Sequence, residues 1–115
     1  MDLPVDYWVK HESYAHGGIV VDASETGFHI YSTENIPIGT KMKIDVLFPN
    51  KYELANFEVL AEIVWKKVSV DMRGKGFQYG LRFVQILEED SKKLKELLSD
   101  RSTSEDFSDH LWNKF

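Results

Sequence analysis

The feature that most constrains the fold of this chain is a regular alternation of apolar and polar residues over three long stretches. Residues 42–48, 57–65 and 77–83 each carry a large or apolar side chain at every second position. Successive side chains of a β-strand point to opposite faces of a sheet, so each stretch predicts a half-buried strand. The apolar face of the second stretch is formed by Phe57, Val59, Ala61, Ile63 and Trp65.

Two shorter stretches predict further strands nearer the N-terminus. Residues 19–21 are all β-branched and end at Asp22, and residues 28–31 form the expected returning strand. Residues 24–27 between them predict a tight turn in which Gly27 supplies a positive φ angle. Five or six strands at this spacing favour a mainly β fold, a small antiparallel barrel or sandwich, because closure removes exposed sheet edges.

The period changes after residue 86, which predicts one helix packed on the barrel. Acidic residues at positions 88–90 suit a helix N-terminus. The apolar residues that then recur at helical spacing are Leu94, Leu97 and Leu98.

The last residues of the chain predict an amphipathic tail. A capping-box sequence at residues 102–105 precedes four apolar residues that share one helical face. These four residues are Phe107, Leu111, Trp112 and Phe115. We therefore expect an N-terminal segment at 1–17, a barrel with its helix at 18–99 and a C-terminal tail at 100–115. The apolar stretch at residues 7–9 is compatible with a docked strand or with a pocket cover.

Composition excludes several functional classes. The chain has no cysteine, so it forms neither a disulfide nor a thiolate metal site. Fourteen basic residues face nineteen acidic ones, and the net charge of −5 excludes broad attraction to nucleic acid. The N-terminus lacks the pattern of a signal peptide, and no apolar run reaches the roughly 18 residues of a membrane span. We expect a cytoplasmic protein.

Catalytic and metal-binding patterns are also missing from the sequence. It contains no Gly-x-Ser-x-Gly motif, no phosphate-binding Gly-rich loop followed by lysine and no cysteine nucleophile. The four histidines do not have the spacing of metal ligands. We therefore expect a protein that is not an enzyme and that holds no metal or cofactor.

One short motif, Asp22-x-Ser24-x-x-Gly27, carries possible binding chemistry. It follows an apolar strand and directs a carboxylate and a hydroxyl across a tight turn. These groups can exchange hydrogen bonds with the edge of a planar heterocycle such as guanine. The alternative is that Asp22 and Ser24 bond only to the amides of their own turn, as Asx and Ser turns do.

The order of motifs along residues 18–98 resembles the PilZ domain family. The motif at Asp22 is followed by Pro37-Ile38-Gly39-Thr40, by Ala61-Glu62-Ile63-Val64-Trp65 and by Tyr79-Gly80-Leu81-Arg82-Phe83-Val84. The resemblance implies a six-stranded antiparallel barrel with a C-terminal helix. It also implies the bacterial second messenger cyclic di-GMP as ligand, with Asp22, Ser24 and Gly27 contacting a guanine.

The sequence departs from the family in its cations. Typical ligand-binding members carry an Arg-x-x-x-Arg motif before the first strand, whose planar guanidinium groups hold phosphates and guanine faces. Here no arginine precedes Arg73, and Lys10 is the only Lys or Arg ahead of Asp22. Residues 1–35 alone sum to −5, because Lys10 faces six acidic residues. Binding of cyclic di-GMP is therefore expected to be weak, assisted by a partner, or lost.

Two functions follow from this combination. In the first, the chain is a stand-alone cyclic di-GMP receptor that uses Asp22, Ser24 and Gly27, with Lys10, His11 or His16, or cations from a partner, replacing part of the arginine motif. In the second, it is a signalling adaptor that binds a protein partner in motility, type IV pilus or second-messenger circuits. Its tail then supplies aromatic anchors for a partner groove. The tail could equally pack on its own barrel.

Overall fold

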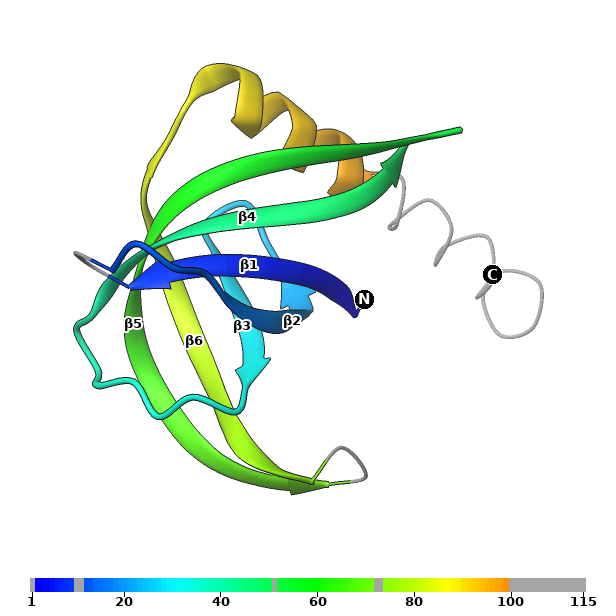
Figure 1. Ribbon diagram of the computed structural model, residues 1–115. Helices are drawn as coiled ribbons and strands as arrows, with labels where there is room; N and C mark the ends of the chain where they lie inside the picture. The colour runs from blue at the N-terminus through cyan, green and yellow to red at the C-terminus, as the bar shows by residue number, and fades with distance from the viewer. Residues whose placement is uncertain (1, 10–11, 51, 72–73, 100–115) are drawn as a thin grey trace, which may run out of the picture.

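Six antiparallel strands close into a barrel in a computed structural model that describes residues 2–9, 12–50, 52–71 and 74–99 (Figure 1). The order of strands around the barrel is β1-β2-β3-β6-β5-β4. The strands are β1 (Leu3–Val9), β2 (His16–Ala23), β3 (Gly27–Ser32), β4 (Lys41–Asn50), β5 (Glu53–Asp71) and β6 (Gly74–Ile86). A helix over residues 88–99 follows β6. The expected six-stranded barrel with a C-terminal helix is confirmed.

The barrel begins at Leu3, before the boundary at residue 18 that the sequence suggested. β1 pairs with β2 on one side and with β4 on the other, so it is needed to close the barrel. Its side chains alternate, and Leu3, Val5 and Tyr7 are buried in the core. Residues 7–9 therefore belong to a strand, and segment 1–17 contributes β1 and the connection that follows it.

The helix covers the free edge of β5. Leu94 and Leu97 are buried in the core. β5 pairs with β6 only from Val59 onwards. Before Val59, the helix supplies hydrogen-bond partners that β6 does not. The carboxylate of Asp90 accepts a hydrogen bond from Glu58 N (3.2 Å), and Lys93 Nζ donates to Asn56 O (3.0 Å). Figure 1 shows the helix, yellow to orange, running beside the β4–β5 hairpin.

The strand pairing has three register shifts, one of them between Leu60 and Ala61 of β5, and the other two determine which side chains reach the outer face at the candidate site. The register of β2 against β3 shifts between Val20 and Asp22, and that of β5 against β6 shifts between Ile63 and Trp65. A bulge places two residues of one strand opposite one of its neighbour. Val20 and Ile63 are fully buried, whereas Asp22 and Trp65 lie outside, opposite His29 and Gly80. The expectation that Trp65 faces the core is wrong, and its side chain is 42% exposed.

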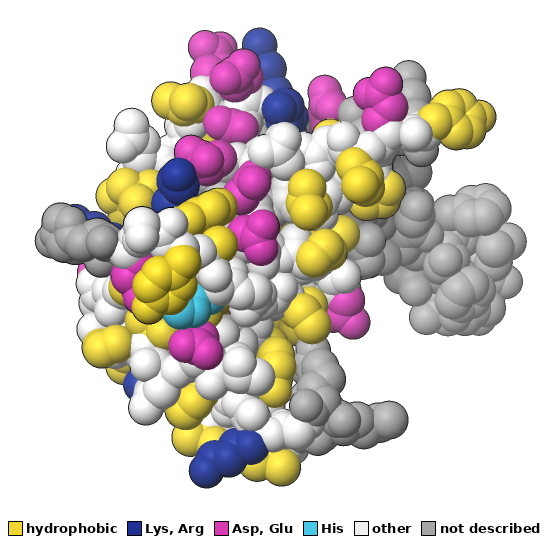
Figure 2. All heavy atoms as spheres, in the orientation of Figure 1, with side chains coloured by type: hydrophobic (Ala, Val, Ile, Leu, Met, Phe, Trp, Pro, Cys, Tyr) yellow, Lys and Arg dark blue, Asp and Glu magenta, His cyan; other side chains and the backbone are white. Residues whose placement is uncertain are grey.

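The outer surface is mixed in character. Figure 2 shows acidic side chains on the helix and on the barrel strands of one face, with separate hydrophobic side chains between them. Isolated apolar residues of this kind are ordinary on protein surfaces. Within the described residues, no helix has the length and apolar character needed to cross a bilayer.

Candidate functional site

An open hollow of about 320 Å³ lies on the outer face of the barrel, over the β2–β3 turn and strands β3, β5 and β6. The sequence motif forms one wall of this hollow, because Asp22, Ser24 and Gly27 all line it. The other lining residues were not predicted as site residues, and they include His29, Trp65, Gly80 and Arg82. The structure thus places the three motif residues together and surrounds them with aromatic and cationic groups.

The turn that carries the motif is closed by its own hydrogen bonds. Ser24 N donates to Gly27 O (3.0 Å), and Ser24 Oγ accepts from Thr26 N (3.2 Å). Asp22 Oδ1 accepts from Ala23 N (2.9 Å). The bond expected for a Ser turn is therefore present, whereas Asp22 accepts from the next residue and not from the amide two residues on, as an Asx turn would. A carboxylate offers about four acceptor sites and a hydroxyl both donates and accepts, so both groups retain capacity for a ligand.

Gly27 is required by a close approach to β6 and not by its φ angle. Its backbone is not in the positive-φ region, in contrast to the prediction. A Cβ atom at this position would lie 2.1 Å from Leu81 O, far inside van der Waals contact. Phe83 N donates to Thr26 O (2.9 Å) and ties the turn to the same stretch of β6. Glycine thus lets the motif turn sit directly against β6.

Trp65 forms a flat apolar surface beside the motif. A Cβ atom at Gly80 would lie 1.9 Å from Trp65 Nε1, so the indole is seated on this glycine. The imidazole of His29 meets the Trp65 ring edge-on, with centroids 5.2 Å apart, and its Nε2 lies 2.6 Å from Gln78 Oε1. Exposed aromatic rings of this kind can stack on nucleobases. A glycine inside a strand pattern was the available signal, since it marks a close approach.

Arg82 is the only Lys or Arg among the described residues that lines the hollow. It lies directly opposite Gly27 in the β3–β6 pairing and opposite Glu62 in the β5–β6 pairing. Its Nη2 donates to Glu62 Oε1 at 2.9 Å.

His16 and the connection before it lie at the end of the β1–β2 hairpin that is away from Asp22. Tyr7 pairs with His16, whereas Leu3 pairs with Val20, at the Asp22 end. Six residues of extended strand separate His16 from Asp22, which is roughly 20 Å. Lys10 and His11, proposed to assist ligand binding, lie outside the described residues.

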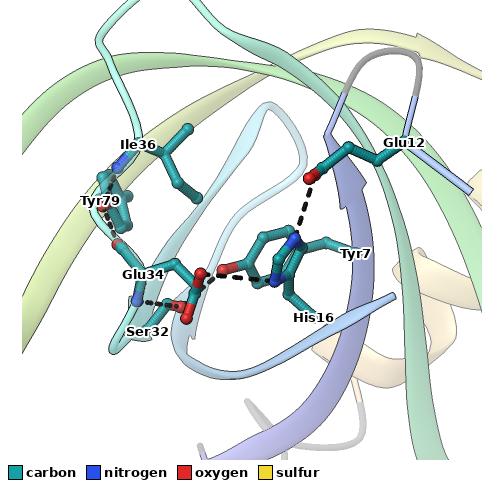
Figure 3. Close-up of polar contacts among 7 residues, drawn as sticks. All are labelled: Tyr7, Glu12, His16, Ser32, Glu34, Ile36 and Tyr79. Carbon is teal, nitrogen blue, oxygen red and sulfur yellow. Dashed lines mark hydrogen bonds and ion pairs between the residues drawn. The ribbon is translucent and has the colours of Figure 1, made fainter. Parts of the chain in front are cut away.

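The His16 end of the barrel carries its own polar cluster (Figure 3). His16 Nε2 lies 3.0 Å from Glu12 Oε1, its Nδ1 lies 3.6 Å from Glu34 Oε1, and its ring stacks on Tyr7. The Tyr7 hydroxyl hydrogen-bonds Ser32 Oγ at 2.6 Å. These contacts join the β1–β2 hairpin to the chain after β3 and hold the barrel together.

Burial of Tyr7 predicts a loss of stability at high pH. Desolvation raises the pKa of Tyr7 from 10.0 to about 12, so the folded state keeps a proton that the unfolded chain releases. The stabilisation is complete below pH 10 and is lost as pH rises towards 12, at up to about 1.4 kcal/mol per pH unit. Urea unfolding between pH 9 and 11.5 measures this slope. Tyr7→Phe is expected to flatten it, and an unchanged slope would contradict the assignment.

The candidate partner-binding residues Phe107, Leu111, Trp112 and Phe115 lie outside the described residues. In the part of the chain that the structure describes, no group of three His, Asp or Glu side chains is arranged to hold a metal ion.

Comparison with known proteins gives one family. The sequence model of the PilZ domain family matches residues 1–100. None of the curated proteins matches the chain.

Two solved structures share the fold. The motility inhibitor MotI/DgrA of Bacillus subtilis superposes with a TM-score of 0.73 at 13% identity, covering 90% of this chain and 48% of that one. This chain therefore spans about half the length of the motility inhibitor. The PilZ domain of Escherichia coli YcgR, solved with cyclic di-GMP, superposes with a TM-score of 0.63 at 13% identity, covering 93% and 88%.

Proposed function

Because this chain belongs to the PilZ domain family, we propose that it is a non-enzymatic cytoplasmic signalling domain of cyclic di-GMP circuits. We propose further that the hollow at the β2–β3 turn receives a guanine of the messenger. The observation that supports this most directly is the placement of Asp22 and Ser24 beside the exposed ring of Trp65. The YcgR domain of the same fold was solved with this messenger.

Each wall of the hollow offers a different contact to guanine. The carboxylate of Asp22 can accept hydrogen bonds from the ring and exocyclic N–H groups, and the hydroxyl of Ser24 can donate or accept. The indole of Trp65 lies flat on Gly80 and presents its face to a base. Guanine offers both a donor-rich edge and a π-face, so it suits this combination.

The supply of positive charge limits the affinity. The sequence holds no arginine before Arg73, and Arg82 is the one cation placed at the hollow within the described residues. Each missing charge-assisted contact costs about 1.5–3 kcal/mol, so two of them lower affinity by roughly two orders of magnitude or more. The isolated chain accordingly binds weakly, and cations from a partner in motility or pilus regulation would strengthen binding.

Calorimetric titration of the purified chain with cyclic di-GMP tests this function. We expect half-saturation at about 10 μM or higher, and a further three- to tenfold weakening in Ser24→Ala and in Asp22→Ala. Ser13→Ala and Asp6→Ala are matched controls, because both residues are exposed and neither lines the hollow. These controls should bind like the parent chain.

Three outcomes would contradict the proposal. Submicromolar affinity would show that the site is complete without further cations. Equal binding by the parent chain, Ser24→Ala and Asp22→Ala would show that the messenger binds elsewhere. The absence of any signal at millimolar messenger would rule out direct binding by this chain.

A further inference from the structure

Arg82 brings a cation to the hollow from β6, a strand outside the Asp22-x-Ser24-x-x-Gly27 motif. Arg82 follows Leu81, which is buried, so the alternation of β6 directs Arg82 outward. On the outer face it lies between Gly27 of the turn and Glu62 of β5. Arg82 therefore lines the hollow, and its guanidinium is paired with the carboxylate of Glu62 beside it.

Two other described cations have contacts away from the hollow. Lys66 Nζ donates to Asn35 Oδ1 and to Ile36 O, on the connection after β3. Lys43 lies over the ring of Trp8, 4.6 Å from its centroid, and 4.0 Å from Glu58. Among the described residues, Arg82 is the one Lys or Arg that lines the hollow, where a phosphodiester seated against the β2–β3 turn would also meet the carboxylate of Asp22.

The ion pair of Arg82 with Glu62 is weak enough to be exchanged. The side chain of Arg82 is 65% exposed and that of Glu62 is 26% exposed, so water screens their attraction. Pairs of this kind contribute little to stability. A phosphate offers the guanidinium two parallel hydrogen bonds, which lysine does not reproduce.

We propose that Arg82 binds a phosphate of the guanine nucleotide and that Glu62 competes with the ligand for this guanidinium. The inference rests on the proposed function, since it assumes a phosphorylated ligand in the hollow. Glu62 then raises the messenger concentration at which the site fills, without touching the ligand. Glu62 of β5 thereby helps to set the messenger concentration at which the site is half filled.

Opposing variants test this competition. Titration with cyclic di-GMP, followed by amide shifts in NMR spectra, is expected to show tenfold or greater weakening in Arg82→Gln and partial recovery in Arg82→Lys. Glu62→Gln is expected to bind about two- to fivefold tighter, since it removes the competitor. In the double variant the gain from Glu62→Gln should vanish. Guanosine, which lacks phosphate, should bind the parent chain and Arg82→Gln equally.

Matched controls separate this effect from general electrostatics. Glu58→Gln removes an exposed carboxylate of β5 that pairs with Lys43, and Lys67→Gln removes an exposed cation of β5. Neither residue lines the hollow, so neither change should alter affinity by more than about twofold. A gain in Glu58→Gln equal to that in Glu62→Gln would overturn the specific competition.

The outcomes also distinguish this inference from the proposed function. If Ser24→Ala weakens binding and Arg82→Gln does not, the guanine site stands and the role of Arg82 is overturned. If Arg82→Gln weakens binding and Ser24→Ala does not, Arg82 is an anion site and the guanine assignment fails. If neither the parent chain nor Glu62→Gln shows any shift, both are overturned.

Discussion

Replacing Gly27 with alanine is expected to destabilise the barrel by about 3 kcal/mol, the upper end of the usual cost of overpacking. The added Cβ would lie 2.1 Å from Leu81 O, a backbone atom that cannot rotate away. Either the turn or β6 must move, which strains the β3–β6 ladder and displaces Ser24. The melting temperature should fall by roughly 10–20 °C, measured by circular dichroism.

Gly17→Ala is the matched control for this change. Gly17 lies in β2, its φ is not positive, and a Cβ there would meet nothing within 4 Å. This variant should be as stable as the parent chain or slightly more stable, because alanine restricts the unfolded state. Equal stability of the two alanine variants would contradict the close approach of Gly27 to β6.

The second large effect is expected at the helix. Leu94→Ala should cost about 2–5 kcal/mol, because it removes a side chain that is 2% exposed and leaves a cavity in the core. The loss loosens the helix from β5, whose free edge the helix covers through Asp90 and Lys93. Urea unfolding gives the free energy, and hydrogen exchange at the backbone amide of Glu58, which donates to Asp90, should become faster.

Lys95→Ala provides the comparison on the same helix. Lys95 is exposed one residue away, so its truncation should change the free energy of unfolding by less than about 0.5 kcal/mol. If Leu94→Ala were equally mild, the helix would contribute little to the stability of the barrel.

Much of the fold could be predicted because most strands bury one face. The alternation in residues 42–48 and 77–83 corresponds to β4 and β6, and the leucines after residue 90 lie on the buried side of the helix. The apolar residues 7–9 alone are compatible with a docked strand or a pocket cover, whereas β1 also includes Leu3 and Val5, which alternate with Tyr7 on the buried face.

The candidate site was only half predictable, and the reason is geometric. A turn motif places Asp22 and Ser24 near each other, since they are close in sequence. The other lining residues lie on β3, β5 and β6, and they reach the hollow only because these strands pair side by side. If the alternation of side chains is continued past Ile63, Trp65 is placed in the core. The bulge adds one residue between Ile63 and Trp65, and the sequence pattern does not reveal it.

Because of the bulges before Asp22 and Trp65, the presence of the motif residues in a sequence is not enough to form the site. Asp22 and Trp65 reach the hollow only because one additional residue precedes each of them on its strand. A related chain that lost Val21 or Val64 would retain Asp22, Ser24, Trp65 and Arg82 and would still turn Asp22 or Trp65 inward. Ligand binding in such relatives therefore depends on strand phase as well as on residue identity. Members with an intact motif can diverge in function through the length of a strand alone.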